Sequence, residues 1–150
     1  MKWTFIVIVF LAGTFIIVAA IGAMLPRTHV ASRSLTLRRT PEEIWPVVIG
    51  IAGGSSVPAD IIESDPPRKQ VSRVTAAQKN FGGTWTITIA PGGPSSPERT
   101  SVLTITEDGW VANPIFRFMS RYVMGHHATM DGILRQVAKK FNEEPALSGE

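Results

Sequence analysis

Residues 113–142 read NPIFRFMSRYVMGHHATMDGILRQVAKKFN, and this stretch decides how the rest of the chain can fold. Asn113 and Pro114 are typical of a helix start, because Asn caps free amide groups and Pro suits the first helical position. At about 100° per residue, one side of this helix is apolar. It comprises Ile115, Phe116, Met119, Tyr122, Val123, Met130, Ile133, Leu134, Val137 and Phe141. The opposite side carries Arg117, Arg121, Asp131, Arg135 and Lys139. The pattern predicts one amphipathic helix about 45 Å long.

The residues before this helix alternate between apolar and polar, which indicates strands with one buried face. The clearest strand is 84–90 (TWTITIA), where Trp85 and Ile87 point to one side and threonines to the other. Residues 99–107 form a second strand, and the Gly/Pro/Ser loop between the two predicts an antiparallel hairpin. An Asp-Gly pair at 108–109 is expected to turn the chain. Weaker strands are expected at residues 31–39, 59–63 and 69–76.

A short helix is predicted between the first strand and the others. Thr40 can cap it, and Glu43 can bond back to the cap. Pro46 removes one helical hydrogen bond, so we expect a kinked helix that ends by Gly50. The resulting order is strand, short helix, antiparallel strands and long terminal helix. Such a sheet has one apolar face, which the terminal helix would cover.

The N-terminal segment has a different character. Residues 3–25 read WTFIVIVFLAGTFIIVAAIGAML and contain no charge. As a helix they would reach about 34 Å, enough to cross a hydrocarbon core of roughly 30 Å. We therefore expect a transmembrane anchor at residues 1–25, with the lipid bilayer as its partner through residues 3–25. A cleaved signal peptide is the alternative, although the run exceeds the roughly 7–15 apolar residues usual there.

Charges beside the anchor bear on orientation. Lys2 precedes the apolar run, whereas several arginines follow it: Arg27, Arg33, Arg38 and Arg39. Positive flanks stay on the cytoplasmic side, so a single-pass protein with a cytoplasmic globular part is favoured over the opposite orientation.

Composition excludes several kinds of protein. The chain has no cysteine, which rules out disulfides, thiolate metal sites and thiol nucleophiles. Its net charge is only +3 and scattered, which argues against a nucleic-acid partner. The adjacent histidines His126 and His127 would point about 100° apart on a helix, so they cannot share a metal. No metal site and no cofactor is predicted.

Short segments spread along the chain carry a family resemblance. They are residues 25–33 (LPRTHVASR), 41–45 (PEEIW), 81–86 (FGGTWT), 103–109 (LTITEDG), 113–118 (NPIFRF), 124–126 (MGH) and 128–129 (AT). In combination they resemble the SRPBCC superfamily of START/Bet v 1-like helix-grip proteins, also described as polyketide cyclase/dehydrase-like. Within it, they resemble a membrane-anchored bacterial subgroup.

The resemblance implies an α+β fold in which a curved antiparallel sheet wraps on a long C-terminal helix. The helix-grip domain would occupy residues 26–142, followed by a frayed tail at 143–150. Only about 31 residues separate Gly50 from Gly82. A helix and one or two strands of the family pattern are therefore expected to be missing, which would leave the sheet incomplete.

The resemblance also implies an apolar cavity between sheet and helix. The candidate ligand-binding residues there are Trp85, Ile87, Met119, Tyr122, His126 and Met130. The expected function is a membrane-tethered, non-catalytic binding module for a hydrophobic or lipid-like small molecule. One alternative is a shortened interaction protein that completes its sheet with a partner chain, which includes a homo-oligomer. Another is a cyclase/dehydrase-type enzyme with His126 or Tyr122 as proton donor.

Overall fold

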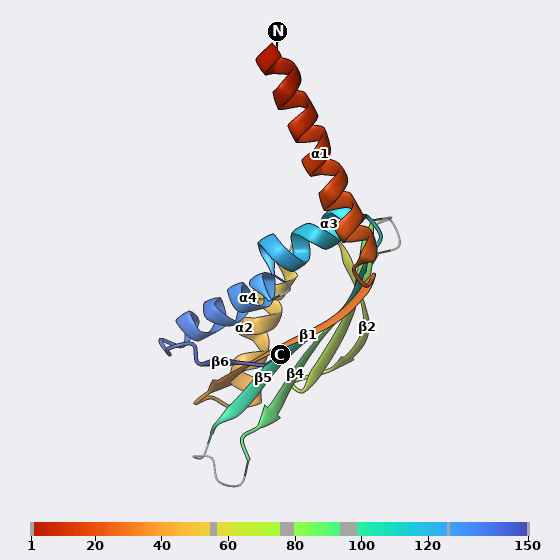
Figure 1. Ribbon diagram of the computed structural model, residues 1–150. Helices are drawn as coiled ribbons and strands as arrows, with labels where there is room; N and C mark the ends of the chain where they lie inside the picture. The colour runs from red at the N-terminus through yellow and green to blue at the C-terminus, as the bar shows by residue number, and fades with distance from the viewer. Residues whose placement is uncertain (1, 55–56, 76–79, 94–98, 126, 150) are drawn as a thin grey trace.

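The computed structural model describes residues 2–54, 57–75, 80–93, 99–125 and 127–149, and shows a helix projecting from an antiparallel sheet (Figure 1). The elements are α1 (Lys2–Met24), β1 (Thr28–Leu37), α2 (Pro41–Gly53), β2 (Ala59–Asp65), β3 (Lys69–Val74), β4 (Phe81–Pro91), β5 (Ser101–Val111), α3 (Pro114–Met119), a π-helical turn η1 (Ser120–Met124), α4 (Ala128–Lys140) and β6 (Leu147–Ser148). The strands lie in the order β2-β3-β4-β5-β1-β6, and every neighbouring pair is antiparallel. The expected α+β architecture is confirmed, and it is consistent with a helix-grip fold.

The hairpin of β4 and β5 forms as the alternation predicts. Ile87 pairs with Ile105, and Ile89 pairs with Leu103, all four buried on one face. The predicted turn at residues 108–109 is wrong, because β5 continues to Val111. This part of β5 is paired on both sides, by β1 and β4, and the two ladders outweigh the turn tendency of an Asp-Gly pair.

Two helices cover the apolar face of the sheet. Helix α2 contributes Ile44 and Val48, and α4 contributes Met130, Leu134 and Val137, none of which is exposed to solvent. Burying one such side chain stabilises the fold by about 1.5–3 kcal/mol. The backbone amide of Thr40 donates to Glu43 Oε2 over 2.9 Å, which confirms the predicted bond back to the cap. Pro46 lies inside α2, which nevertheless continues to Gly53 rather than ending by Gly50.

The single long C-terminal helix is not observed. It is divided into α3, η1 and α4, and Gly125 separates η1 from α4 with a φ of 74°. This left-handed conformation favours glycine and cannot continue a right-handed helix. Helix α3 crosses the end of α1, whereas α4 lies beside α2 (Figure 1). The sheet is therefore gripped by α4 and α2, without a rod that spans its length.

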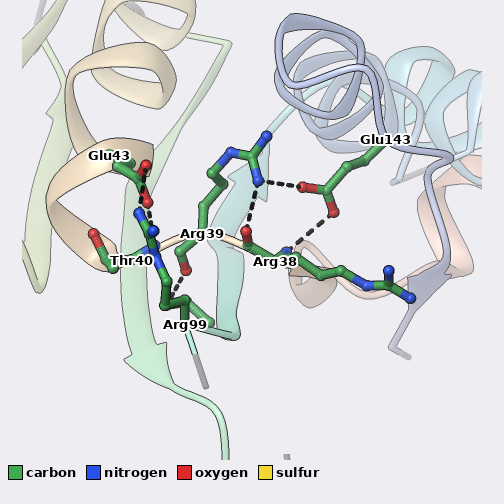
Figure 2. A network of polar contacts seen from close by, with 7 residues as sticks. Arg38, Arg39, Thr40, Glu43, Arg99 and Glu143 are labelled. Carbon is green, nitrogen blue, oxygen red and sulfur yellow. Dashed lines mark hydrogen bonds and ion pairs between the residues drawn. The ribbon is translucent and has the colours of Figure 1, made fainter. Parts of the chain in front are cut away.

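The tail after α4 is held in place, in contrast to the expected fraying. The backbone amide of Arg38 donates to Glu143 Oε2 over 3.1 Å, and the Arg39 guanidinium lies 3.6 Å from Glu143 Oε1 (Figure 2). Strand β6 then pairs with β1 at Ser34 and Leu35. Since the edge of β1 was free to accept a strand, the tail completes the sheet on that side.

Helix α1 is exposed along its length, and Gly22 is its one buried residue among those described. It is long and apolar enough to cross a membrane. A buried core helix would pass the same test of composition, but α1 is not buried. The structure therefore leaves two interpretations of this segment, an anchor or a signal sequence.

Candidate functional site

Three of the sequence-predicted ligand residues come together in the core. Ile87 of β4 is 4% exposed and Met130 of α4 is fully buried, while Trp85 is half-buried and packs against this cluster. The predicted cluster of β4 and α4 side chains therefore exists, but its centre is closed to solvent.

The other predicted residues lie elsewhere. Met119 ends α3, and Tyr122 in η1 is 60% exposed with its ring 5.0 Å from that of Phe118. The break at Gly125 carries this segment away from α4. His126 lies outside the described residues, so its place is not assigned. Binding of a ligand by any of the six stays a prediction.

An open hollow of about 270 Å³ lies beside the start of β4, at the end of the sheet where Trp110 in its lining pairs with Thr28, four residues after α1. It forms because β4 extends past β3, whose last pair with it joins Arg73 to Thr84. The lining residues are Arg73, Val74, Thr75, Phe81, Gly82, Gly83, Thr84, Asp108 and Trp110. None of the five sequence-predicted residues that the structure describes lines this hollow.

Two glycines shape the hollow. A Cβ on Gly82 would lie 2.8 Å from the Trp110 indole nitrogen, so the indole rests directly on the glycine backbone. Gly83 has a φ of 146°, and a Cβ there would collide with the Asp108 carbonyl. Adjacent glycines in a strand of threonine and isoleucine mark a close approach of this kind. This signal in the sequence could have directed attention to the segment opposite Trp110.

The hollow combines apolar and charged groups. Phe81 and Trp110 are each 38% exposed, so their rings remain available for contact. Arg73 and Asp108 both pair with Thr84, one from each neighbouring strand, and so share one face of the sheet. Two strand spacings separate them, about 10 Å. Aromatic rings beside a cation and a carboxylate can hold a molecule with an apolar part and a polar part.

The junction between α1 and the domain is built around Arg117. The sequence places this residue on the solvent side of its helix, but it is only 7% exposed. Its Nη1 donates to the Leu25 carbonyl over 2.7 Å, and its Nη2 donates to the Ala112 carbonyl over 3.3 Å. The guanidinium thus occupies the C-terminal end of α1, where the helix dipole favours a positive charge. The burial of Arg117 removes it from the exposed basic side that the sequence predicts for residues 117–139.

Backbone packing completes the junction. Gly22 of α1 lies so close to Pro114 of α3 that a Cβ would overlap the Pro114 carbonyl. A second hollow, of about 40 Å³, lies beside this contact and is lined by Arg117, Arg121 and His29 among others. Helix α1 is therefore joined to the domain by packing and hydrogen bonds as well as by the chain.

Other charged groups serve the fold. Arg33 Nε lies 3.1 Å from Asp131 Oδ1 and ties β1 to α4. At the end of the sheet far from α1, Glu43 pairs with Arg99 over 3.1 Å (Figure 2). The Thr40 amide, followed by Arg99, lowers the pKa of Glu43 below its ordinary value. Within the described part of the chain, no three His, Asp or Glu side chains converge to hold a metal ion.

Comparison with known proteins supports the fold. No protein-family model and no curated protein sequence matches this chain. The structure is similar to that of a conserved protein from Geobacillus kaustophilus, with a TM-score of 0.56 and 14% identity over 79% of this chain and 99% of that one. It is also similar to protein MLL2253 from Mesorhizobium loti, with a TM-score of 0.52 and 11% identity over 77% of this chain and 97% of that one.

A truncated norcoclaurine synthase from Thalictrum flavum aligns less closely, with a TM-score of 0.49 and 12% identity over 78% of this chain and 95% of that one. This last likeness is too slight to support an argument. The two likenesses with TM-scores above 0.5 show that this α+β arrangement occurs in other solved structures, and membership of the SRPBCC superfamily stays a prediction from the sequence resemblance. At such low identities the likenesses show the fold alone.

Proposed function

We propose that this protein is a membrane-anchored, non-catalytic binding domain that takes an amphiphilic, lipid-like small molecule at the end of its sheet nearest the bilayer. The observation that carries the proposal is the position of the 270 Å³ hollow. Trp110 beside it precedes Val111, whose amide donates to the Arg27 carbonyl over 2.8 Å, three residues after α1 ends. A molecule leaving the membrane surface would meet this hollow first.

Anchoring by α1 is supported by its junction. A cleaved signal peptide needs no fixed contact with the mature domain. Here Arg117 is buried against the Leu25 carbonyl, and Gly22 packs on Pro114. Removal of α1 would take away the Gly22 backbone that packs on Pro114 and the Ala23 carbonyl that accepts a hydrogen bond of 3.5 Å from Arg117 Nη1. These contacts favour a retained helix over a cleaved one.

A cytoplasmic position of the domain is part of the proposal. Arg27 and Arg121 are exposed near the end of α1, whereas Lys2 flanks its start. Arg33 counts less than the sequence suggests, because it is folded into β1 and paired with Asp131. Two exposed arginines against one lysine still favour the cytoplasmic side. A single cysteine at Thr36 of β1 should resist a membrane-impermeant maleimide in intact cells and react after lysis.

A non-catalytic role is supported by the place of Tyr122. In the enzyme hypothesis it would donate a proton within a closed pocket, yet it is exposed and lines neither hollow. The groups at the larger hollow, Arg73 and Asp108, suit recognition of a polar head.

The test of ligand binding is mass spectrometry of small molecules that are co-extracted with the full chain. Gly82→Val should lower the recovered amount at least about tenfold, because its side chain displaces Trp110 from the hollow wall. Gly93→Val is the matched control, since a Cβ at Gly93 meets no atom within 4 Å. Arg73→Gln should also lower the recovered amount, and because Arg73 is an exposed residue this substitution does not alter the strand backbone. Equal recovery from all variants, or no co-extracted molecule, would refute the proposed site.

A second candidate function rests on β2, an edge strand whose seven residues are all exposed. Ile61 and Ile62 are 62% and 47% exposed, and such an edge can accept a strand from another chain. A bulge between Ile61 and Glu63 disturbs the edge, which weakens this alternative. Measuring the size of the full chain in detergent distinguishes the small-molecule binding domain from a protein that pairs β2 with another chain. Pairing with a second copy would double the protein mass of the complex.

A further inference from the structure

The segment formed by α3 and η1 exposes part of the side that the sequence predicts to be buried. Phe116, Tyr122 and Val123 are 57%, 60% and 62% exposed, although all three belong to the apolar side of the predicted helix. Arg117, from the charged side, is buried instead. A helix that faces water buries its apolar residues and exposes its arginines.

Helix α4 provides an internal comparison, because it follows directly after Gly125. There the apolar residues Leu134 and Val137 are fully buried, and the basic residues Arg135 and Lys139 are exposed. The predicted apolar side is thus buried after the break but exposed at three positions before it. The difference between the two segments lies in what surrounds them.

The surroundings of the α3–η1 segment are set by α1. Pro114 contacts Gly22 in the last turns of α1, and Arg117 bonds to the carbonyl of Leu25. The segment runs away from this contact across the end of α1 (Figure 1). Its exposed side chains therefore lie near the level at which a membrane-spanning α1 would leave the hydrocarbon.

Charge supports the same placement. Arg121 lies within this segment and Arg27 lies just beyond α1, and both are exposed. Exposed aromatic and apolar side chains with arginines beside them are typical of a segment lying in the membrane interface. Tyrosine in particular is enriched at the headgroup level, where its ring is apolar and its hydroxyl is hydrated.

We propose that the α3–η1 segment lies in the plane of the membrane interface, with Phe116, Tyr122 and Val123 inserted at the boundary between headgroups and acyl chains. Arg27 and Arg121 then face lipid phosphates. This inference rests on the proposed anchoring by α1 and adds a second point of contact. A helix that crosses the bilayer at one point leaves the domain free to tilt, whereas a seated segment fixes which side of the sheet faces the lipid.

The test uses spin labels on single cysteines, which the cysteine-free chain allows without any background substitution. Labels are placed at Ile16 in α1, at Val123 in η1 and at Lys139 in α4, all exposed positions. The full chain is reconstituted in vesicles of phosphatidylcholine and phosphatidylglycerol. Collision with oxygen reports lipid around a label, and collision with a water-soluble nickel chelate reports water.

We expect the Ile16 label to be deep in lipid, the Val123 label to be shallow in lipid and the Lys139 label to be in water. Arg121→Glu should move the Val123 label towards water. An Ile16 label in lipid with a Val123 label as hydrated as Lys139 would overturn the seating and leave the anchor intact. A hydrated Ile16 label would overturn the anchor itself, and the seating with it. If substitution at Val123 alters the fold, a label at Phe116 allows the same measurement.

Discussion

Replacement of Arg117 by methionine should loosen α1 from the domain. Methionine keeps an unbranched apolar side chain, shorter than that of arginine, and removes every donor. The two shorter hydrogen bonds of the guanidinium go to the carbonyls of Leu25 and Ala112, at 2.7 and 3.3 Å, and a third, of 3.5 Å, goes to the carbonyl of Ala23. A hydrogen bond from a charged group contributes about 1.5–3 kcal/mol, so the two together contribute roughly 3–6 kcal/mol.

Water can replace part of this stabilisation. A hollow of about 40 Å³ lies beside Arg117, so water can reach the carbonyls that the substitution uncovers. We therefore expect Arg117→Met to lower the free energy of unfolding by about 3 kcal/mol, the lower end of that range. Urea titration of the full chain in detergent, followed by near-ultraviolet circular dichroism, measures this change.

Arg121→Met is the matched control, because Arg121 is exposed in the next turn and, among the residues that the structure describes, its side chain makes no hydrogen bond to α1. It should change the free energy of unfolding by less than about 0.5 kcal/mol. Spin labels at Thr14 in α1 and Thr36 in β1 give a second measurement, since their distance distribution should widen only in the Arg117 variant. If the two variants unfold alike and the distance distribution keeps its width, Arg117 does not join α1 to the domain.

Three further predictions concern glycines and one carboxylate. Gly22→Ala should destabilise the full chain by about 1–3 kcal/mol through overpacking at the α1–α3 contact, whereas Gly13→Ala, in the same helix with no atom within 4 Å of its Cβ, should not; equal thermal midpoints would contradict this. Gly132→Ala fills open space on α4, so it should raise the free energy of unfolding by about 1 kcal/mol in urea titration, and a loss of stability would count against the helix there. The pKa of Glu43 is lowered, first by the Thr40 amide. Its contribution is therefore present above the ordinary glutamate pKa and is lost as pH falls through the lowered one. Glu43→Gln should reduce the dependence of stability on acid pH, and an unchanged pH profile would show that the interaction contributes nothing.

The sheet was the part of the fold that the sequence predicted best. Alternation in residues 84–90 and 99–107 identified the β4–β5 hairpin and the inward side of each strand. This works because a strand with one buried face must repeat every two residues. The turn predicted at residues 108–109 is wrong because local turn preference cannot reveal that β1 and β4 pair with these residues from both sides.

The candidate site was predicted less well. Trp85, Ile87 and Met130 were correctly placed on facing sides of sheet and helix, since both patterns identify the core. Periodicity does not distinguish a core from a cavity, because both require apolar residues at the same spacing. The 270 Å³ hollow depends instead on where β3 ends relative to β4, which is a property of strand lengths rather than of any motif.

The failure at residues 114–124 has a separate cause. A helical wheel assigns apolar residues to the interior on the assumption that water lies outside. For α4 that assumption holds, and Leu134 and Val137 are buried as predicted. For α3 and η1 the interior position is taken by Arg117, whose guanidinium donates to the carbonyls of Ala23 and Leu25 at the end of α1. Phe116 and Val123 of the same segment are exposed, and neighbouring exposed apolar side chains of this kind can mark an interaction surface. The burial of Arg117 is thus tied to the α1 junction, and the proposed seating of this segment in a lipid interface would give its exposed apolar side chains a favourable environment.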